Sequence, residues 1–253
     1  MQQKHDHHHG HEREHVVIHA QHYEEDKTGS RIWLVGGIAL LAVAVVYSVV
    51  LITHSRSKAA SGSNLELVQM QFDPSHDSLG MVSGSDKATV TVREFADFQC
   101  PACGGFEPVI QQMRKDYVDT GKVRFVFFDF PIEDLHKNAV MASQFARCAG
   151  DQNKYWPMHD SLYANQAQWA DMKDPLDTFL GYSGKLGLDG NRMLGCIRAG
   201  TTHQDVMRSE AYGDALGLHG TPTFAVNDQA YVGGVGYPDL KALIDAQLAA
   251  PAH

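Results

Sequence analysis

The residues with the clearest chemical potential in this sequence are two cysteines separated by two positions, Cys100 and Cys103, in the stretch QCPAC. They stand where a strand-like run gives way to a helix-like run, so the first sulfur is expected at a helix N-terminus. There the unpaired backbone amides and the positive end of the helix dipole favour a thiolate and lower the cysteine pKa. Cys103, one turn further along, can displace a mixed disulfide. We therefore expect Cys100 to be the nucleophile and Cys103 the resolving thiol.

A close cysteine pair can also be half of a zinc site. Such a site needs a second close pair or suitably spaced histidines. The other two cysteines, Cys148 and Cys196, stand far apart in the chain and form no second close pair. We therefore expect no metal at Cys100 and Cys103, and no cofactor.

The segments around the pair predict the elements that position it. Val90 and Val92 alternate with polar residues before Phe95, which is typical of a strand that ends at the first cysteine. A helix with an apolar face follows as far as Gly121, and Pro108 should kink it. The apolar run 123–128 then predicts a second, central strand. A strand, a helix and a strand in this order form a right-handed parallel crossover.

The remainder of the domain is predicted to be a long helical insertion followed by a hairpin. Residues 135–216 have helical periodicity and no convincing strand. Strands are expected again at 223–226 and 230–232, joined by a turn at Asn227-Asp228, and a helix follows Pro238. The sequence thus predicts an α/β domain over 88–250, with about four strands and a helical insertion at about 133–217.

Before this domain, the composition predicts three segments. Residues 1–31 contain eight histidines and almost no apolar residues, which favours a disordered, solvated tail, although neutral imidazoles can also hold metal ions. Residues 32–53 are uncharged and mostly apolar, long enough for one transmembrane helix. We expect an uncleaved signal anchor; the alternative is a cleaved signal peptide. Residues 54–87 are expected to be a linker, with one short ordered piece at 65–72.

The charge distribution limits the classes of partner. Residues 1–58 carry equal numbers of basic and acidic side chains, so the net charge of −9 lies on the remainder of the chain. An acidic domain without a basic stripe argues against nucleic acid and anionic lipid headgroups as partners.

Three stretches, in order, carry a family resemblance: VTVREFADFQCPAC, DFPIEDLHKNAVMASQFARCAGDQNKYWPMHDSLYANQ and GLHGTPTFAVN. Over residues 79–248 the chain resembles the DsbA-like branch of the thioredoxin superfamily. The resemblance implies a thioredoxin fold with an inserted helical subdomain. It also implies the activity of a protein thiol-disulfide oxidoreductase that acts on protein substrates outside the cytoplasm.

The resemblance also assigns roles to residues. Cys100 and Cys103 match the redox pair, and Pro222 matches a cis-proline that packs against it, which leaves the backbone of Thr221 free to bind a substrate chain. Glu94 matches a buried acid beneath the resolving cysteine, where a raised pKa would suit proton transfer. Against this role, a strand glutamate more often faces solvent.

The state of the other two cysteines, disulfide or free thiol, depends on the redox compartment. Beside an extracytoplasmic redox site, Cys148 and Cys196 are expected to form a structural disulfide; in a reducing compartment they would be buried free thiols. The aromatic and histidine residues of the insertion are expected in the core or in a groove, without chemistry of their own; they are His136, Tyr155, Trp156 and His159.

Two departures from the family bear on the direction of reaction. Ala102 stands where the strongly oxidising members have histidine, and Thr221 stands where they often have valine. A less stabilised thiolate gives a less oxidising couple. We expect net oxidation of exported proteins. The alternatives are an extracytoplasmic reductase or isomerase fed by membrane electron carriers, and a copper- or zinc-handling protein.

The loop charges on the two sides of the apolar segment do not decide its orientation. The expected location therefore follows from the expected function. Disulfide donation needs an oxidising compartment. We expect a single-pass protein of the bacterial cytoplasmic membrane, with the tail inside and the catalytic domain in the periplasm. Its expected partners are exported proteins with thiols or disulfides and a membrane redox protein that recycles the pair.

Overall fold

The computed structural model describes residues 67–250. The expected tail (1–31), the expected transmembrane segment (32–53) and the first part of the expected linker (54–66) lie outside the described residues. Between residues 67 and 250, no helix is both long enough and apolar enough to cross a bilayer.

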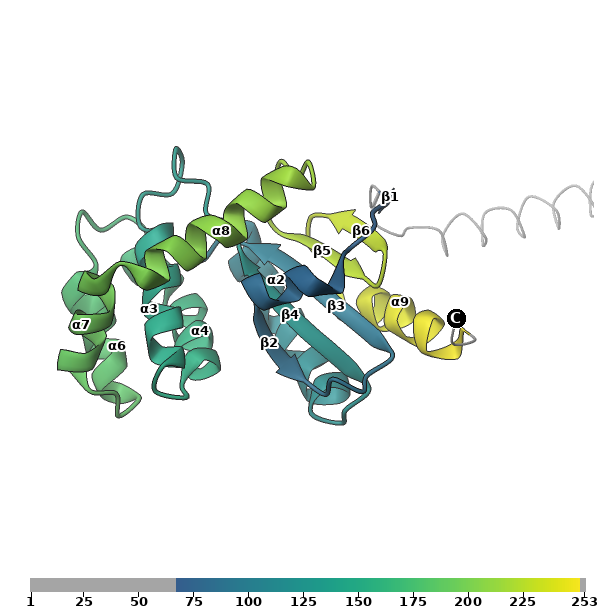
Figure 1. Ribbon diagram of the computed structural model, residues 1–253, viewed down its shortest axis with the longest axis horizontal. Helices are drawn as coiled ribbons and strands as arrows, with labels where there is room; N and C mark the ends of the chain where they lie inside the picture. Colours follow the sequence, from purple (N-terminus) through teal and green to yellow (C-terminus); the bar gives the residue numbers. More distant parts are fainter. Residues whose placement is uncertain (1–66, 251–253) are drawn as a thin grey trace, which may run out of the picture. The chain divides into compact units, whose positions relative to one another are not determined.

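The described residues form a six-stranded mixed sheet in the order β1-β6-β5-β3-β4-β2 (Figure 1). The strands are β1 (Leu67–Gln69), β2 (Met81–Gly84), β3 (Val90–Ala96), β4 (Val123–Asp129), β5 (Thr223–Val226) and β6 (Gln229–Val232). β3 and β4 are parallel, with Val90 opposite Val123, and the other neighbours are antiparallel. All but one residue of each central strand is buried, which agrees with their nearly continuous apolar sequences.

The crossover between β3 and β4 carries the cysteine pair. It consists of α2 (Pro101–Met113), continued by the π-helical turn η2 (Arg114–Val118). Gly121, with φ of 74°, takes the left-handed conformation that ends the segment. The C-terminal helix α9 (Tyr237–Ala249) contacts α2, β3 and β5. One apolar cluster contains residues of α2, α4 (Tyr155–Ala164) and α9 together with alternate strand residues, among them Val92, Phe125, Phe127 and Phe224.

The helical insertion lies where the sequence predicts it. Its helices are α3 (Ala139–Gly150), α4 (Tyr155–Ala164), α5 (Gln166–Trp169), α6 (Leu176–Lys185), α7 (Gly190–Ala199) and α8 (Thr201–Ala215). In Figure 1, α3, α4, α6 and α7 form a group beside the sheet, and α8 runs from this group back to the sheet. There α8 contacts β4, and its Tyr212 packs on a second apolar cluster that includes Phe95 and Phe128.

The expected linker over 54–87 extends too far along the chain, and the expected four strands are too few. β1 falls within the short ordered piece expected at 65–72, whereas the 3-10 helix η1 (Pro74–Leu79) and β2 lie in the part expected to be a tether; β1 and β2 are strands of the sheet. Asp77 of η1 is 2 % exposed and forms ion pairs with Arg93 of β3 and Arg124 of β4. The polar composition that suggested a tether therefore includes the buried counterion of two strand arginines.

A disulfide joins Cys148 of α3 to Cys196 of α7, with their Cα atoms 5.8 Å apart. It links two helices of the insertion across a sequence separation of 48 residues. A crosslink of this span removes conformational freedom mainly from the unfolded chain.

We expect Cys148→Ala combined with Cys196→Ala to lower the free energy of unfolding by about 4 kcal/mol, the value for a loop of this length in the chain-entropy model. Urea denaturation measures this loss. In a background of Cys100→Ala and Cys103→Ala, chemical reduction should lower the stability similarly, because only this disulfide remains. An unchanged urea midpoint in both experiments would contradict a stabilising crosslink.

Candidate functional site

The cysteine pair lies at the junction between β3 and α2. Cys100 is the N-cap residue of α2 in extended conformation, and Pro101 follows at the first helical position, where its missing N–H costs no helix hydrogen bond. Cys103 lies one turn further along. Cys100 is 7 % exposed and Cys103 is 1 % exposed, so the first sulfur is the more accessible of the two.

The two thiols have opposite acidities. A hydrogen bond from the Cys103 thiol is the main cause that lowers the pKa of Cys100 to about 5; the Thr221 side chain and the backbone amides of Cys103 and Ala102 add to it, and burial opposes it. Burial raises the pKa of Cys103 well above its usual value. At neutral pH Cys100 is therefore a thiolate and Cys103 a thiol. The stabilisation of the dithiol form by this thiolate is complete above the unfolded pKa of about 8.5 and is lost as the pH falls through 5.

Glu94 is buried beneath this pair. It projects from β3, is 1 % exposed, and its Oε2 has no hydrogen-bond partner within residues 67–250. Burial raises the pKa of Glu94 to about 8, and the charge of Glu94 contributes to the raised pKa of Cys103. A carboxyl group in this state can hold a proton at neutral pH close to the thiol that must gain and lose one.

The loop before β5 lies against the first cysteine. The Thr221-Pro222 peptide bond is cis, and the Cys100 Sγ lies 3.5 Å from the Thr221 carbonyl oxygen. Two hydrogen bonds fix the loop: the Thr223 hydroxyl donates to the Gly220 carbonyl at 2.8 Å, and the Gly233 amide donates to the Pro222 carbonyl at 2.8 Å. The structure thus brings together Cys100, Cys103, Glu94, Thr221 and Pro222, whereas Cys148 and Cys196 form their disulfide inside the insertion.

The helical insertion holds the turn that carries Cys100, a feature that the sequence analysis missed. The side-chain amide of Gln166 in α5 donates to the carbonyl oxygens of Phe98 and Cys100, at 2.7 and 2.9 Å. A Cβ atom at Gly104 would lie 2.5 Å from the Gln166 Oε1, so glycine leaves the room that this side chain needs. The available signal was that Gln166 ends the longest of the three stretches that carry the family resemblance.

Glu107, like Glu94, is a buried carboxyl group, but the sequence analysis did not identify it. It lies one turn after Cys103 in α2, is 4 % exposed, and burial raises its pKa to about 7. The signal was its spacing, because residues four apart on a helix share a face. A glutamate in the buried stripe of an otherwise apolar helix is the pattern that would have identified it.

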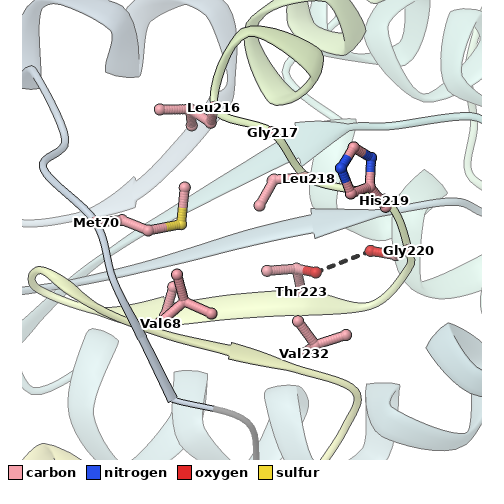
Figure 2. Close-up of a pocket in the computed structure, with 10 residues that line it drawn as sticks. Val68, Met70, Leu216, Gly217, Leu218, His219, Gly220, Thr223 and Val232 are labelled. Atoms are coloured by element: carbon pink, nitrogen blue, oxygen red, sulfur yellow. Dashed lines mark hydrogen bonds between the residues drawn. The ribbon is translucent and has the colours of Figure 1, made fainter.

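An apolar cavity of about 300 Å³ adjoins the cis-proline loop (Figure 2). Val68, Met70 and Val232 lie on one side of it and Leu216 and Leu218 on the other. Thr223 lines the cavity, while the next residue, Phe224, packs on Phe106 of α2. Because successive strand residues face opposite sides of a sheet, the cavity opens on the side away from α2. Neither cysteine of the pair lines it.

Comparison with known proteins agrees with this fold. A thioredoxin family model matches residues 77–246. The crystal structure of oxidised BdbD from Bacillus subtilis matches with a TM-score of 0.64 at 22% identity, covering 73% of this chain and 100% of that one. At this identity the likeness establishes the fold.

Two curated relatives extend the comparison. Disulfide bond formation protein D of Bacillus subtilis is 24% identical over 177 residues, which are 66% of this chain and 76% of that protein. The Na(+)/H(+) antiporter NhaA 3 of Salinispora tropica is 32% identical over 238 residues, which are 90% of this chain and 34% of that protein. The chain thus spans about a third of the length of that antiporter.

We expect the ultraviolet absorbance of the Cys100 thiolate to titrate with a midpoint near pH 5, because the Cys103 thiol and the helix amides stabilise the anion. Cys103 should add no transition near neutral pH, since burial raises its pKa. The control is Cys100→Ser, which should lack the transition. A midpoint at about pH 8 or above, close to that of a free cysteine, would refute the stabilised thiolate.

Proposed function

The chain belongs to the thioredoxin family, as a thiol-disulfide oxidoreductase of the DsbA-like type, and from this premise we propose that it oxidises the thiols of exported proteins through Cys100 and Cys103. The observation that carries the proposal is the unequal pair, a thiolate at Cys100 beside a buried thiol at Cys103. Ion transport is not proposed, because the chain corresponds to about a third of the antiporter that it matches.

The reaction proceeds in two exchanges. A substrate thiolate attacks the Cys100 sulfur of the Cys100–Cys103 disulfide, and Cys103 leaves as a thiolate and takes up a proton. A second substrate thiolate then attacks the substrate sulfur of the mixed disulfide, and Cys100 leaves as a thiolate. The substrate loses two electrons and gains a disulfide, and the protein ends in the dithiol form.

Substrate chains bind through their backbone. The loop at Thr221-Pro222 lies at the end of β5, where an extended chain can add main-chain hydrogen bonds beside the Cys100 sulfur. Hydrogen bonds of this kind do not depend on the substrate side chains. A broad range of unfolded or partly folded substrates follows.

The lowered pKa of Cys100 favours oxidation over reduction as the net direction. A stabilised thiolate stabilises the reduced protein, so the disulfide form readily passes its disulfide on. Ala102 offers no side-chain donor to the thiolate, so the couple is less oxidising than that of relatives with histidine at this position. A reductase, an isomerase and a metal carrier are the competing functions.

We expect Cys100→Ser to abolish oxidative refolding of a reduced substrate protein, because it removes the sulfur that the substrate thiolate attacks. We expect Cys103→Ser to accumulate mixed disulfides with disulfide-bonded proteins, because the Cys100 thiolate still attacks them and no second thiol displaces the product. Non-reducing electrophoresis measures both outcomes. Combined Cys148→Ser and Cys196→Ser is the control and should retain activity. Insulin reduction without oxidative refolding would favour a reductase. Stoichiometric zinc or copper bound by Cys100 and Cys103 would favour a metal carrier.

The proposed location is the bacterial cytoplasmic membrane, with one span at 32–53 and the domain outside. Two observations support it: the apolar segment itself, and the Cys148–Cys196 disulfide, since such bonds persist mainly in oxidising compartments. A membrane redox protein would restore the Cys100–Cys103 disulfide after each turnover.

We expect a reporter that works only in the cytoplasm to be active when it is fused before Gln21 and silent when it is fused after His253. A reporter that works only outside should give the reverse pattern and serves as the control. If the C-terminal fusion is active in the cytoplasm, the proposed topology is wrong.

A further inference from the structure

His159 of α4 is fully buried in the core, between two carboxyl groups. Its Nδ1 lies 2.9 Å from Oδ1 of Asp160 and 3.8 Å from Oε1 of Glu107. The Asp160 side chain is 39 % exposed and accepts a hydrogen bond of 2.8 Å from Arg114. One nitrogen of the imidazole therefore forms a hydrogen bond to a carboxyl group that reaches the solvent and lies within ion-pair distance, beyond hydrogen-bond length, of a buried one.

The cluster of His159, Glu107 and Asp160 contains buried polar atoms that form no hydrogen bond. His159 Nε2 and Glu107 Oε1 are buried and have no hydrogen-bond partner within residues 67–250. Buried polar atoms without partners cost free energy and are rare in folded proteins. An apolar ring would fill this part of the core at less cost, so the imidazole at this position points to a chemical role.

The surroundings of His159 connect it to the redox pair. The Phe127 ring contacts the imidazole with centroids 4.7 Å apart, and Phe127 is the register partner of Glu94. The Phe98 ring, two residues before Cys100, contacts the imidazole at 5.3 Å. Glu94 and His159 thus lie on the same side of the sheet, next to the same phenylalanine.

The carboxyl groups around His159 become less acidic from the surface toward the interior. Burial raises the pKa of Glu94 to about 8 and that of Glu107 to about 7, with His159 opposing the shift at Glu107. Burial also acts to raise the pKa of Asp160, but His159 and Arg114 outweigh it and lower that pKa. The titratable and charged groups that face this region are Cys103 and Glu107 from α2, Arg114 from η2, Glu94 from β3, Asp97 from the turn after β3, and Tyr155, Asp160 and Tyr163 from α4.

We propose that His159 is a positioning residue for the thiol-disulfide reaction, which passes a proton between Glu107 and Asp160 and so links the buried carboxyl groups behind Cys103 to the solvent. The inference rests on the function proposed above. When Cys103 leaves as a thiolate, it takes a proton from Glu94. Glu107 then protonates Glu94 again. Glu107 in turn takes the proton at His159 Nδ1, and solvent returns it by way of Asp160. One proton enters for each Cys103 thiolate formed.

The test is His159→Asn, which keeps an N–H donor for Asp160 but cannot pass on a proton. Single-turnover reduction of the Cys100–Cys103 disulfide by dithiothreitol is followed against pH, in water and in deuterium oxide. We expect the rate to fall by about tenfold or more near neutral pH. The solvent isotope effect should grow, because proton delivery through the interrupted path then limits the rate. The Cys100 titration midpoint should not move. Lower stability with an unchanged pH profile and isotope effect would overturn the proposal.

Two further variants keep the test decisive if His159→Asn does not fold. Asp160→Asn changes a partly exposed side chain, and Glu107→Gln keeps the shape of the buried one; each should slow the same step. Glu107→Gln combined with Asp160→Asn should be no slower than the worse single variant, because groups in one path are not additive. Additive effects would argue against a shared path.

The matched control is His76→Asn, at a surface histidine whose Nδ1 lies 3.6 Å from Asp73 Oδ2. It should leave the pH profile unchanged. If the wild-type protein does not exchange disulfides at all, the proposed function fails. If it does, and the variants at 107, 159 and 160 retain its pH profile and isotope effect, only the proton path fails.

Discussion

The close pairing of the two cysteine side chains is the constraint on which the site depends, because the Cys103 side chain lowers the pKa of Cys100 while burial raises the pKa of Cys103. It forms only if both sulfurs project from the first turn of one helix whose N-terminus lies at the end of a buried strand. The antiparallel pairing of β3 with β5, which sets Phe95 opposite Thr223, brings the cis-proline loop to the same end of the sheet. Two segments 121 residues apart therefore meet at one sulfur.

The helical insertion makes this arrangement possible by closing the site from the side. Gln166 holds the carbonyl of Cys100, and α4 supplies His159 and Tyr163, which pack on Phe98, two residues before Cys100. Without that cover, the carboxyl groups of Glu94 and Glu107 would be hydrated and would ionise at their usual pH. The insertion thus determines the acidity of groups that lie on β3 and α2.

The sequence predicts the central strands, the crossover helix and the insertion, because their apolar periodicity is strong. It does not predict η1 and β2, because Asp77 and its neighbours look like a polar tether until Arg93 and Arg124 are known to lie beside them. Glu94, Thr221 and Pro222 were found through the family resemblance. Glu107 and His159 were not found, since spacing places a residue on a helix face but does not say which distant segments cover that face. The expected tail and transmembrane segment lie outside the described residues and stay predictions.

The measurement that tests the central claim most directly is the reduction potential of the Cys100–Cys103 couple, determined by equilibrating the fragment from about Ser61 onward with a glutathione redox buffer. A stabilised Cys100 thiolate should make the couple more oxidising than thioredoxin, at about −270 mV, and the absence of histidine at position 102 should keep it below the about −120 mV of DsbA. A value between these limits is the predicted result. A value at or below about −270 mV would contradict the account, because a Cys100 pKa near 5, lower than the about 7 of thioredoxin, should make the couple more oxidising than thioredoxin.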